Sequence, residues 1–255
     1  MTTSVQTRRF EGKAVLITGA GSGIGKATAM RFGAEGARVL CADVNEAGAE
    51  ATAAAIREAG GDAFARRCDV SDPEAAKATV AAAVERFGGL YAIANVAGIG
   101  GFKRAGELTF EQWNRFIAVN LTGTWLMCQA ALPHILASKG AIVNVGSVAG
   151  IKSHPWSAAY CASKGGVVLL TKALAVEFGR KGVRINVLCP GGIETPLISQ
   201  FSLPEGASQA ALMRITPLGR MGLPEEVAAT IAFLASEDAT YINGSTIVVD
   251  GGMTA

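Results

Sequence analysis

The sequence has few of the residues that build metal sites and disulfide frameworks. It contains two histidines, His134 and His154, and five cysteines, none of which belongs to a CxxC pair. An odd number of scattered cysteines favours small apolar side chains in a reducing compartment over a disulfide framework. We therefore expect no bound metal ion and a cytoplasmic location.

The sequence also has no large excess of positive or negative charge and no long apolar run. The 23 basic and 21 acidic residues leave a net charge of +2, and no basic block exceeds two residues. This balance argues against a nucleic-acid or membrane partner. No stretch reaches the ~18–20 uncharged apolar residues that span a bilayer, and the polar start of the chain lacks the apolar run of a secretory signal. We expect residues 1–9 to form a flexible arm.

What the sequence does contain is an alternation of short apolar runs, often β-branched, with longer alanine-rich segments. Most of the short runs are apolar almost throughout, which is typical of strands covered on both faces. The expected strands are residues 14–18, 38–43, 63–69, 91–95, 141–145, 184–189 and 246–249. The expected helices are residues 24–35, 46–59, 72–87, 111–136, 157–180 and 225–236.

Repeated strand–helix units of this kind predict a parallel sheet with helices on both faces. We expect residues 10–255 to form one doubly wound α/β domain around a seven-stranded, mostly parallel sheet. Residues 190–224 have no clear periodicity. A long loop in such a fold is more often functional than filler, so we expect a substrate loop or lid there.

A glycine-rich turn follows the first expected strand, with the sequence Thr18-Gly19-Ala20-Gly21-Ser22-Gly23-Ile24-Gly25. Glycines let a backbone approach a pyrophosphate closely, and the following helix offers unpaired N–H groups to the phosphate charge. A P-loop fits less well, because Ala20 occupies its first glycine position and Ala27 stands where Ser or Thr should hold magnesium. The turn predicts a dinucleotide site, with a purely structural turn as the alternative.

An acidic residue, Asp43, closes the second expected strand. A carboxylate ~20 residues beyond the glycines can accept hydrogen bonds from ribose hydroxyls and repels a 2′-phosphate. The adjacent Val44 is not basic, which favours NAD over NADP as the cofactor. The alternative role for Asp43 is to cap the next helix.

Tyr160 and Lys164 lie one helical turn apart, on one face of the expected helix. A neighbouring ammonium lowers the pKa of a phenol, which would let Tyr160 exchange a proton with an alcohol oxygen while hydride moves at carbon. A Tyr-x-x-x-Lys pair alone is equally typical of a surface helix, so its meaning depends on the glycine turn.

Taken together, these motifs resemble the short-chain dehydrogenase/reductase family in its compact, NAD-dependent type. The resemblance runs from about Phe10 to Gly252 and implies a Rossmann fold. The residues that carry it are 18–25, Asp43, Asn95-Val96-Ala97-Gly98, Asn120, Ser147, Tyr160, Lys164 and Pro190-Gly191. The family often has a second Asn where this chain has Val96, which affects one local hydrogen bond.

The resemblance also implies roles for individual residues. Ser147 would bind the substrate oxygen, Tyr160 would transfer the proton, and Lys164 would bind the nicotinamide ribose and lower the pKa of Tyr160. Asn120 would support the helix and a water that reaches Lys164. The cofactor-binding residues would be Gly19, Ser22, Gly23, Ile24, Gly25, Asp43, Val44, Asp69, Val70, Asn95, Ala97, Gly98, Tyr160, Lys164, Pro190, Gly191, Ile193 and Thr195.

The substrate wall is expected from the segments that follow the strand ends. Its apolar composition favours a hydrophobic secondary alcohol, a cyclic alcohol or a ketone, although several of these side chains could simply pack the lid. The candidates are Ser147, Ile151, His154, Trp156, Gly192, Leu197 and Phe201, with Phe102, Leu203 and Met213 as further wall residues. The resemblance implies a homotetramer, or a homodimer, built on the two longest helices.

Two other functions remain open from the sequence. One is an NADPH-dependent reductase of 3-oxoacyl thioesters, which Asp43 disfavours. The other is a non-catalytic NAD(H)-binding sensor or scaffold, which the set Ser147, Tyr160 and Lys164 disfavours.

Overall fold

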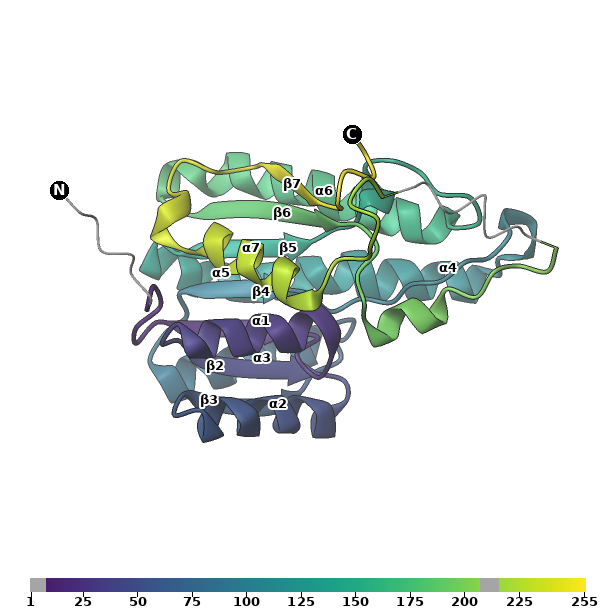
Figure 1. Ribbon diagram of the computed structural model, residues 1–255. Helices are drawn as coiled ribbons and strands as arrows, with labels where there is room; N and C mark the ends of the chain where they lie inside the picture. Colours follow the sequence, from purple (N-terminus) through teal and green to yellow (C-terminus); the bar gives the residue numbers. More distant parts are fainter. Residues whose placement is uncertain (1–7, 207–215) are drawn as a thin grey trace.

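The sheet has seven strands, all parallel, in the order β3-β2-β1-β4-β5-β6-β7. Figure 1 shows the computed structural model, which describes residues 8–206 and 216–255. The expected doubly wound fold is confirmed, with β3 ending two residues earlier than expected. The strands are β1 (Ala14–Thr18), β2 (Arg38–Asp43), β3 (Asp62–Arg67), β4 (Ala92–Asn95), β5 (Ala141–Val145), β6 (Arg184–Pro190) and β7 (Thr246–Val249).

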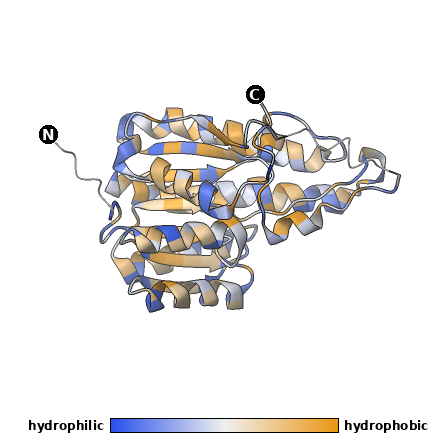
Figure 2. Ribbon diagram, viewed as in Figure 1, coloured by the Kyte–Doolittle hydropathy of each residue, from blue (hydrophilic) through white to orange (hydrophobic). Residues whose placement is uncertain are grey.

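Helices cover both faces of this sheet. The main ones are α1 (Gly23–Ala34), α2 (Glu46–Glu58), α3 (Pro73–Phe87), α4 (Phe110–Phe116), α5 (Gly123–Ser138), α6 (Ala158–Phe178) and α7 (Pro224–Ala235). Along β1, Val15 and Ile17 face the layer of α1, α2 and α7, whereas Ala14 and Leu16 face the layer of α3, α5 and α6. Because both faces are covered, the strands are apolar at successive positions, as their colours in Figure 2 show.

The single helix expected over residues 111–136 is interrupted. A π-helical segment, η2 (Ile117–Thr122), separates α4 from α5 and contains the buried Asn120. A π segment carries one residue more per turn than an α-helix, and such segments often occur at functional sites. The sequence does not reveal this widening, because residues 117–122 are mostly apolar and would be equally compatible with an α-helix.

Helix α6 is long and apolar, although it contains charged residues such as Lys164 and Lys172. By length and composition alone, the 24-residue segment Ala158–Lys181 could cross a membrane. It packs along the sheet through Val167 and Ala175, which are buried, and it holds the buried Lys164. Core helices of globular proteins pass the same test of length and composition.

The expected arm, residues 1–9, falls largely outside the described residues, which begin at Arg8. Arg9 is bound to the body of the protein, because its guanidinium donates to Glu35 at 2.6 and 2.7 Å. The arm was therefore predicted too long at its inner end.

Candidate active site

The glycine turn lies between β1 and α1 and packs closely on the end of β4. Thr18 Oγ1 accepts hydrogen bonds from the N–H groups of Val96 (3.0 Å) and Ala97 (3.1 Å). A Cβ on Gly19, which has φ +71°, would lie 2.9 Å from backbone atoms of Ala97. Gly25 is equally constrained, since its Cβ would lie 2.0 Å from Gly19 O. These glycines are required for the turn to close.

The start of α1 is open to an anion. Its N-cap residue, Ser22, has an extended backbone and makes no side-chain capping bond to the helix. The first N–H groups of α1 therefore have no side-chain partner at this cap, and the positive end of the helix dipole points towards the turn. This is the arrangement that binds a pyrophosphate.

Asp43 lies directly beside the glycine turn. Its Oδ2 accepts from Gly21 N at 2.8 Å and its Oδ1 from Asn45 N at 2.8 Å. The alternative role as the cap of α2 is filled by Asn45, whose side chain accepts from Gly48 N at 3.2 Å. The half-exposed Asp43 carboxylate is thus positioned at the cavity wall with lone pairs left for a ligand.

Lys164 is buried on α6, and its Nζ donates to Val145 O at 2.8 Å. Burial lowers the pKa of the Lys164 ammonium from 10.5 to about 8. Burial also raises the pKa of the Tyr160 phenol, and hydrogen bonding with the Ser147 side chain opposes that rise. In this structure the expected lowering of the Tyr160 pKa by Lys164 is therefore not found, because desolvation dominates and the ammonium is engaged by the Val145 carbonyl.

Ser147 follows β5 and is 8% exposed. Its Oγ accepts a hydrogen bond from Ala149 N at 3.1 Å, which anchors the side chain at the start of a short 3-10 helix, η3 (Val148–Gly150). Because this contact uses a lone pair, the hydroxyl proton can be donated to the Tyr160 oxygen or to a substrate oxygen in the cavity.

Asn120 holds neighbouring elements together. Its Oδ1 accepts from Ile99 N at 2.8 Å, and its Nδ2 donates to Ile99 O and to Ser163 Oγ, both at 3.0 Å. A Cβ on Gly98 would lie 3.1 Å from Asn120 Oδ1 and 3.3 Å from Lys164 Nζ. Asn120 lies behind the cavity wall, so its role is to position the chain beside Lys164.

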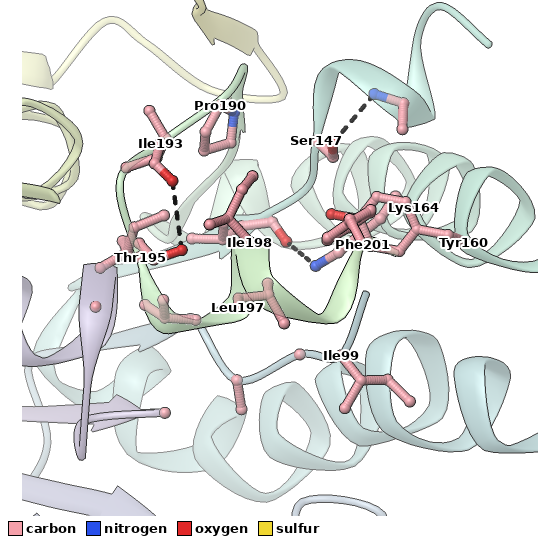
Figure 3. Close-up of a pocket in the computed structure, with 18 of the residues that line it drawn as sticks. Ile99, Ser147, Tyr160, Lys164, Pro190, Ile193, Thr195, Leu197, Ile198 and Phe201 are labelled. Atoms are coloured by element: carbon pink, nitrogen blue, oxygen red, sulfur yellow. Dashed lines mark hydrogen bonds between the residues drawn. The ribbon is translucent and has the colours of Figure 1, made fainter. Parts of the chain in front are cut away.

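One cavity of about 870 Å³ joins the glycine turn to Tyr160 (Figure 3). A dinucleotide fits the glycine turn, the open N-terminal end of α1, the carboxylate at the end of β2 and the size of the cavity. Most residues predicted for the site line it: Gly19, Ser22, Gly23, Ile24, Gly25, Asp43, Val44, Asp69, Val70, Ala97, Gly98, Ser147, His154, Tyr160, Lys164, Pro190, Gly191, Gly192, Ile193, Thr195, Leu197 and Phe201.

Apart from Asn120, three predicted site residues are not among those that line the cavity. Asn95 is buried, and its Nδ2 donates to Asn144 Oδ1 at 2.8 Å, so it braces β4 against β5. Ile151 directly follows η3 and is 43% exposed. Trp156 packs against Phe102, with ring centroids 6.4 Å apart, and thus supports the wall from behind. Met213 lies outside the described residues.

Several lining residues were not predicted. Val96, Ile99 and Gly146 adjoin predicted residues at strand ends, so their positions could have been read from that neighbourhood. Arg115 on α4 and Met253 near the end of the chain gave no comparable signal, because only the tertiary fold brings them to the cavity. Among the described residues, no group of three or more His, Cys, Asp or Glu side chains could hold a metal ion.

Comparison with known proteins agrees with this geometry. A family model described as enoyl-(acyl carrier protein) reductase matches residues 19–254. The chain is 43% identical over 253 residues to the cyclohexanol dehydrogenase of Acinetobacter sp. (strain SE19), covering 98% of each protein. It is 45% identical over 249 residues to the 3beta-hydroxysteroid dehydrogenase 1 of Eggerthella lenta, covering 96% of this chain and 95% of that protein.

The fold is shared with solved structures as well. The crystal structure of levodione reductase superposes with a TM-score of 0.90 at 39% identity, covering 96% of this chain and 98% of that one. Sequence match, fold and site geometry lead to one conclusion: the chain belongs to the short-chain dehydrogenase/reductase family, whose dehydrogenases are oxidoreductases that use a nicotinamide cofactor.

Proposed function

We propose that the protein is an NAD(H)-dependent dehydrogenase that interconverts apolar secondary alcohols, cyclic ones included, and their ketones. One observation carries the proposal: Ser147, Tyr160 and Lys164 line the same cavity as the glycine turn and Asp43. The names of two relatives, a cyclohexanol dehydrogenase and a 3beta-hydroxysteroid dehydrogenase, support a cyclic alcohol.

The preference for NAD over NADP is supported by charge. Asp43 is a carboxylate held beside the glycine turn, where it would repel a 2′-phosphate. The adjacent Val44 is apolar and 54% exposed. Among the described lining residues, the Lys and Arg side chains are Arg115 on α4 and Lys164 on α6, and neither lies in the segment that follows β2 and Asp43.

The three residues divide the chemistry between them. The nicotinamide cofactor, when bound, supplies the acceptor or donor of hydride. Ser147 donates its free proton to the substrate oxygen and fixes the position of that oxygen. As the phenolate, Tyr160 would take the hydroxyl proton of the alcohol during oxidation, and as the phenol it would give that proton to the carbonyl oxygen during reduction. Lys164 keeps two N–H donors beyond its bond to Val145 O, and these would hold the ribose hydroxyls.

The segment 190–224 would close the substrate side of this cavity. Its described part contributes Pro196, Leu197, Ile198 and Leu203 to the lining, as a lid of apolar side chains would. Residues 207–215 lie outside the described residues.

The assembly we propose is a homotetramer in which α4, α5 and α6 meet their counterparts in a second copy. These helices expose large apolar side chains: Phe110 (73%), Trp113 (37%), Trp125 (42%), Leu169 (68%) and Val176 (85%). Large apolar side chains that are exposed in a single chain support an association surface on these helices. The five cysteines are all free and four are buried, which supports a cytoplasmic location.

The function is tested with a panel of secondary alcohols and NAD, following NADH by absorbance, and with the same panel and NADP. Tyr160→Phe is expected to lower kcat by roughly 10²–10⁴-fold, the usual contribution of an acid–base group. The affinity for NADH, measured by fluorescence titration, should stay within a few fold, because the ring itself is retained.

Three results would contradict the proposal. Normal turnover by Tyr160→Phe at saturating cofactor would remove the acid–base role. Faster turnover with NADPH and a 3-oxoacyl thioester would favour the reductase suggested by the description of the family model. NADH binding without turnover of any alcohol or ketone, together with a cellular role intact in Tyr160→Phe, would favour a sensor or scaffold.

A further inference from the structure

Gly100 lies where a side chain would collide with an aromatic ring. A Cβ built on Gly100 would lie 2.2 Å from Cζ and 2.3 Å from Cε2 of Phe201. The backbone itself does not call for glycine here, since Gly100 is not among the described residues with positive φ. The missing side chain therefore serves one purpose that the structure shows, which is to leave a notch for the Phe201 ring.

The ring in this notch forms part of the wall beside Tyr160. Phe201 follows a short 3-10 helix, η5 (Pro196–Gln200), and its ring centroid lies 5.6 Å from that of Tyr160 and 5.0 Å from that of Phe102. Both pairs are edge-to-face, at interplanar angles of 82° and 75°. At these separations the rings touch, so no part of a ligand passes between them. Figure 3 shows Phe201 next to Tyr160.

This corner of the cavity offers apolar contact and little charge. The charged side chains among the described lining residues are Asp43, Asp69, Arg115 and Lys164. Asp43 ends β2 and Asp69 follows β3, the charge of Arg115 acts on Asp69, and Lys164 binds Val145 O. The rings of Phe102 and Phe201 therefore meet a neutral part of the substrate.

We infer that Gly100 and Phe201 together determine substrate size, and select secondary alcohols on a single six-membered carbon ring over alcohols on fused rings. The inference rests on the proposed function, because it concerns the substrate of the same site. A compact ring would lie against the aromatic corner with its hydroxyl at Ser147 and Tyr160. In a fused-ring alcohol bound in the same way, the second ring would be directed towards Phe201, which lines this side of the cavity.

A mutant cycle tests the coupling. The four proteins are the wild type, Gly100→Ala, Phe201→Ala and the double variant, each assayed with NAD and either cyclohexanol or the fused-ring alcohol 2-decalol. Phe201→Ala should raise the ratio of kcat/KM for 2-decalol to that for cyclohexanol by about tenfold or more, the scale of a changed apolar pocket. Gly100→Ala should lower kcat/KM for cyclohexanol about tenfold alone and less than about twofold in the Phe201→Ala background.

Gly106→Ala is the matched control. It makes the same chemical change in the same connection, at a glycine whose Cβ would meet nothing within 4 Å and which is not among those with positive φ. It should leave both kcat/KM values unchanged. NADH affinity should be the same in all five proteins, because the changes lie outside the cofactor-binding residues.

The inference is overturned if Gly100→Ala is as damaging in the Phe201→Ala background as in the wild type, or if Phe201→Ala leaves the substrate ratio unchanged. Failure of the proposed function gives a different result, in which the wild type oxidises neither alcohol. Thermal unfolding of the same four proteins then reports the packing alone. Gly100→Ala should lower Tm in the wild-type background and leave it unchanged where Phe201 is already removed. Equal losses of Tm in the two backgrounds would show that Gly100 does not make room for the Phe201 ring.

Discussion

Lys164 is a residue of this site whose buried position disfavours its charged form. Its ammonium is buried and has one protein acceptor, Val145 O. Burial brings its pKa from 10.5 to about 8, so the unfolded chain binds this proton more tightly than the folded protein does. Between these two values the free energy of unfolding rises with pH, because the unfolded state then carries the extra proton.

We therefore predict that Lys164→Met abolishes turnover and yet stabilises the fold. At pH 7 the free energy of unfolding should rise by roughly 2–3 kcal/mol, the value of the pKa shift less the loss of one hydrogen bond. The gain should shrink as the pH rises from 8 to 10.5. Urea denaturation at pH 7 and pH 10.5 measures it.

Lys172→Met provides the control, because Lys172 is exposed on the same helix. This variant should change the free energy of unfolding only slightly, and by the same amount at both pH values. An equal gain for Lys164→Met at pH 7 and pH 10.5 would show that its stabilisation comes from added apolar contact and not from the buried charge.

Helix α1 is anchored at its C-terminal end by an acidic residue. Glu35 has a side chain 7% exposed and accepts hydrogen bonds from Arg9 and Arg31. Burial raises the pKa of the Glu35 carboxyl, but the bonds from Arg9 and Arg31 outweigh burial and hold that pKa below its usual value. The stability that results is present above the unfolded pKa of 4.5 and is lost as the pH falls through the lowered folded pKa.

Glu35→Gln is expected to lower the free energy of unfolding by about 2 kcal/mol at pH 7, because it leaves Arg9 half of its partners in a partly buried site. The difference from wild type should shrink as the pH falls below 4.5 and disappear once the pH is below the lowered folded pKa of Glu35. Glu226→Gln is the control, since the ion pair of Glu226 with Arg220 is exposed and should contribute little. A loss for Glu35→Gln that persists at low pH would contradict the electrostatic explanation.

Elements differ in how far the sequence predicted them. Short runs, most of them apolar, located all seven strands, because their length and their alternation with longer alanine-rich segments distinguish them from helices. The π segment around Asn120 was not predicted, because its mostly apolar composition is equally compatible with an α-helix. In the site, residues at strand ends were predicted, whereas Arg115 and Met253 depend on long-range packing. The pKa of Tyr160 was mispredicted, because spacing along a helix says nothing of burial.

For the whole molecule, the proposed tetramer gives a direct prediction. Leu169 and Val176 lie on the outer face of α6 and are 68% and 85% exposed in the single chain. A charge there would be buried without a partner on association. Leu169→Glu with Val176→Glu should convert the tetramer to a smaller species in sedimentation velocity at micromolar concentration.

Ala81→Glu is the control for this experiment, because Ala81 is exposed on α3, away from the proposed contact. It should leave the sedimentation coefficient unchanged. A wild type that sediments as a monomer, or a double variant that sediments like the wild type, would contradict the proposed contact.

The strand order has a consequence for how this protein could diversify. In the sheet, β2 lies on one side of β1, whereas β4 and then β5 lie on the other side. The residues that bind the nucleotide and the residues that contact the substrate therefore follow different strands. Substitutions in the segment after Pro196 would then change the substrate specificity and leave the binding of the adenosine half of the cofactor unchanged. A library confined to that stretch, screened with one and the same nucleotide, would sample new reactions at little risk to the fold.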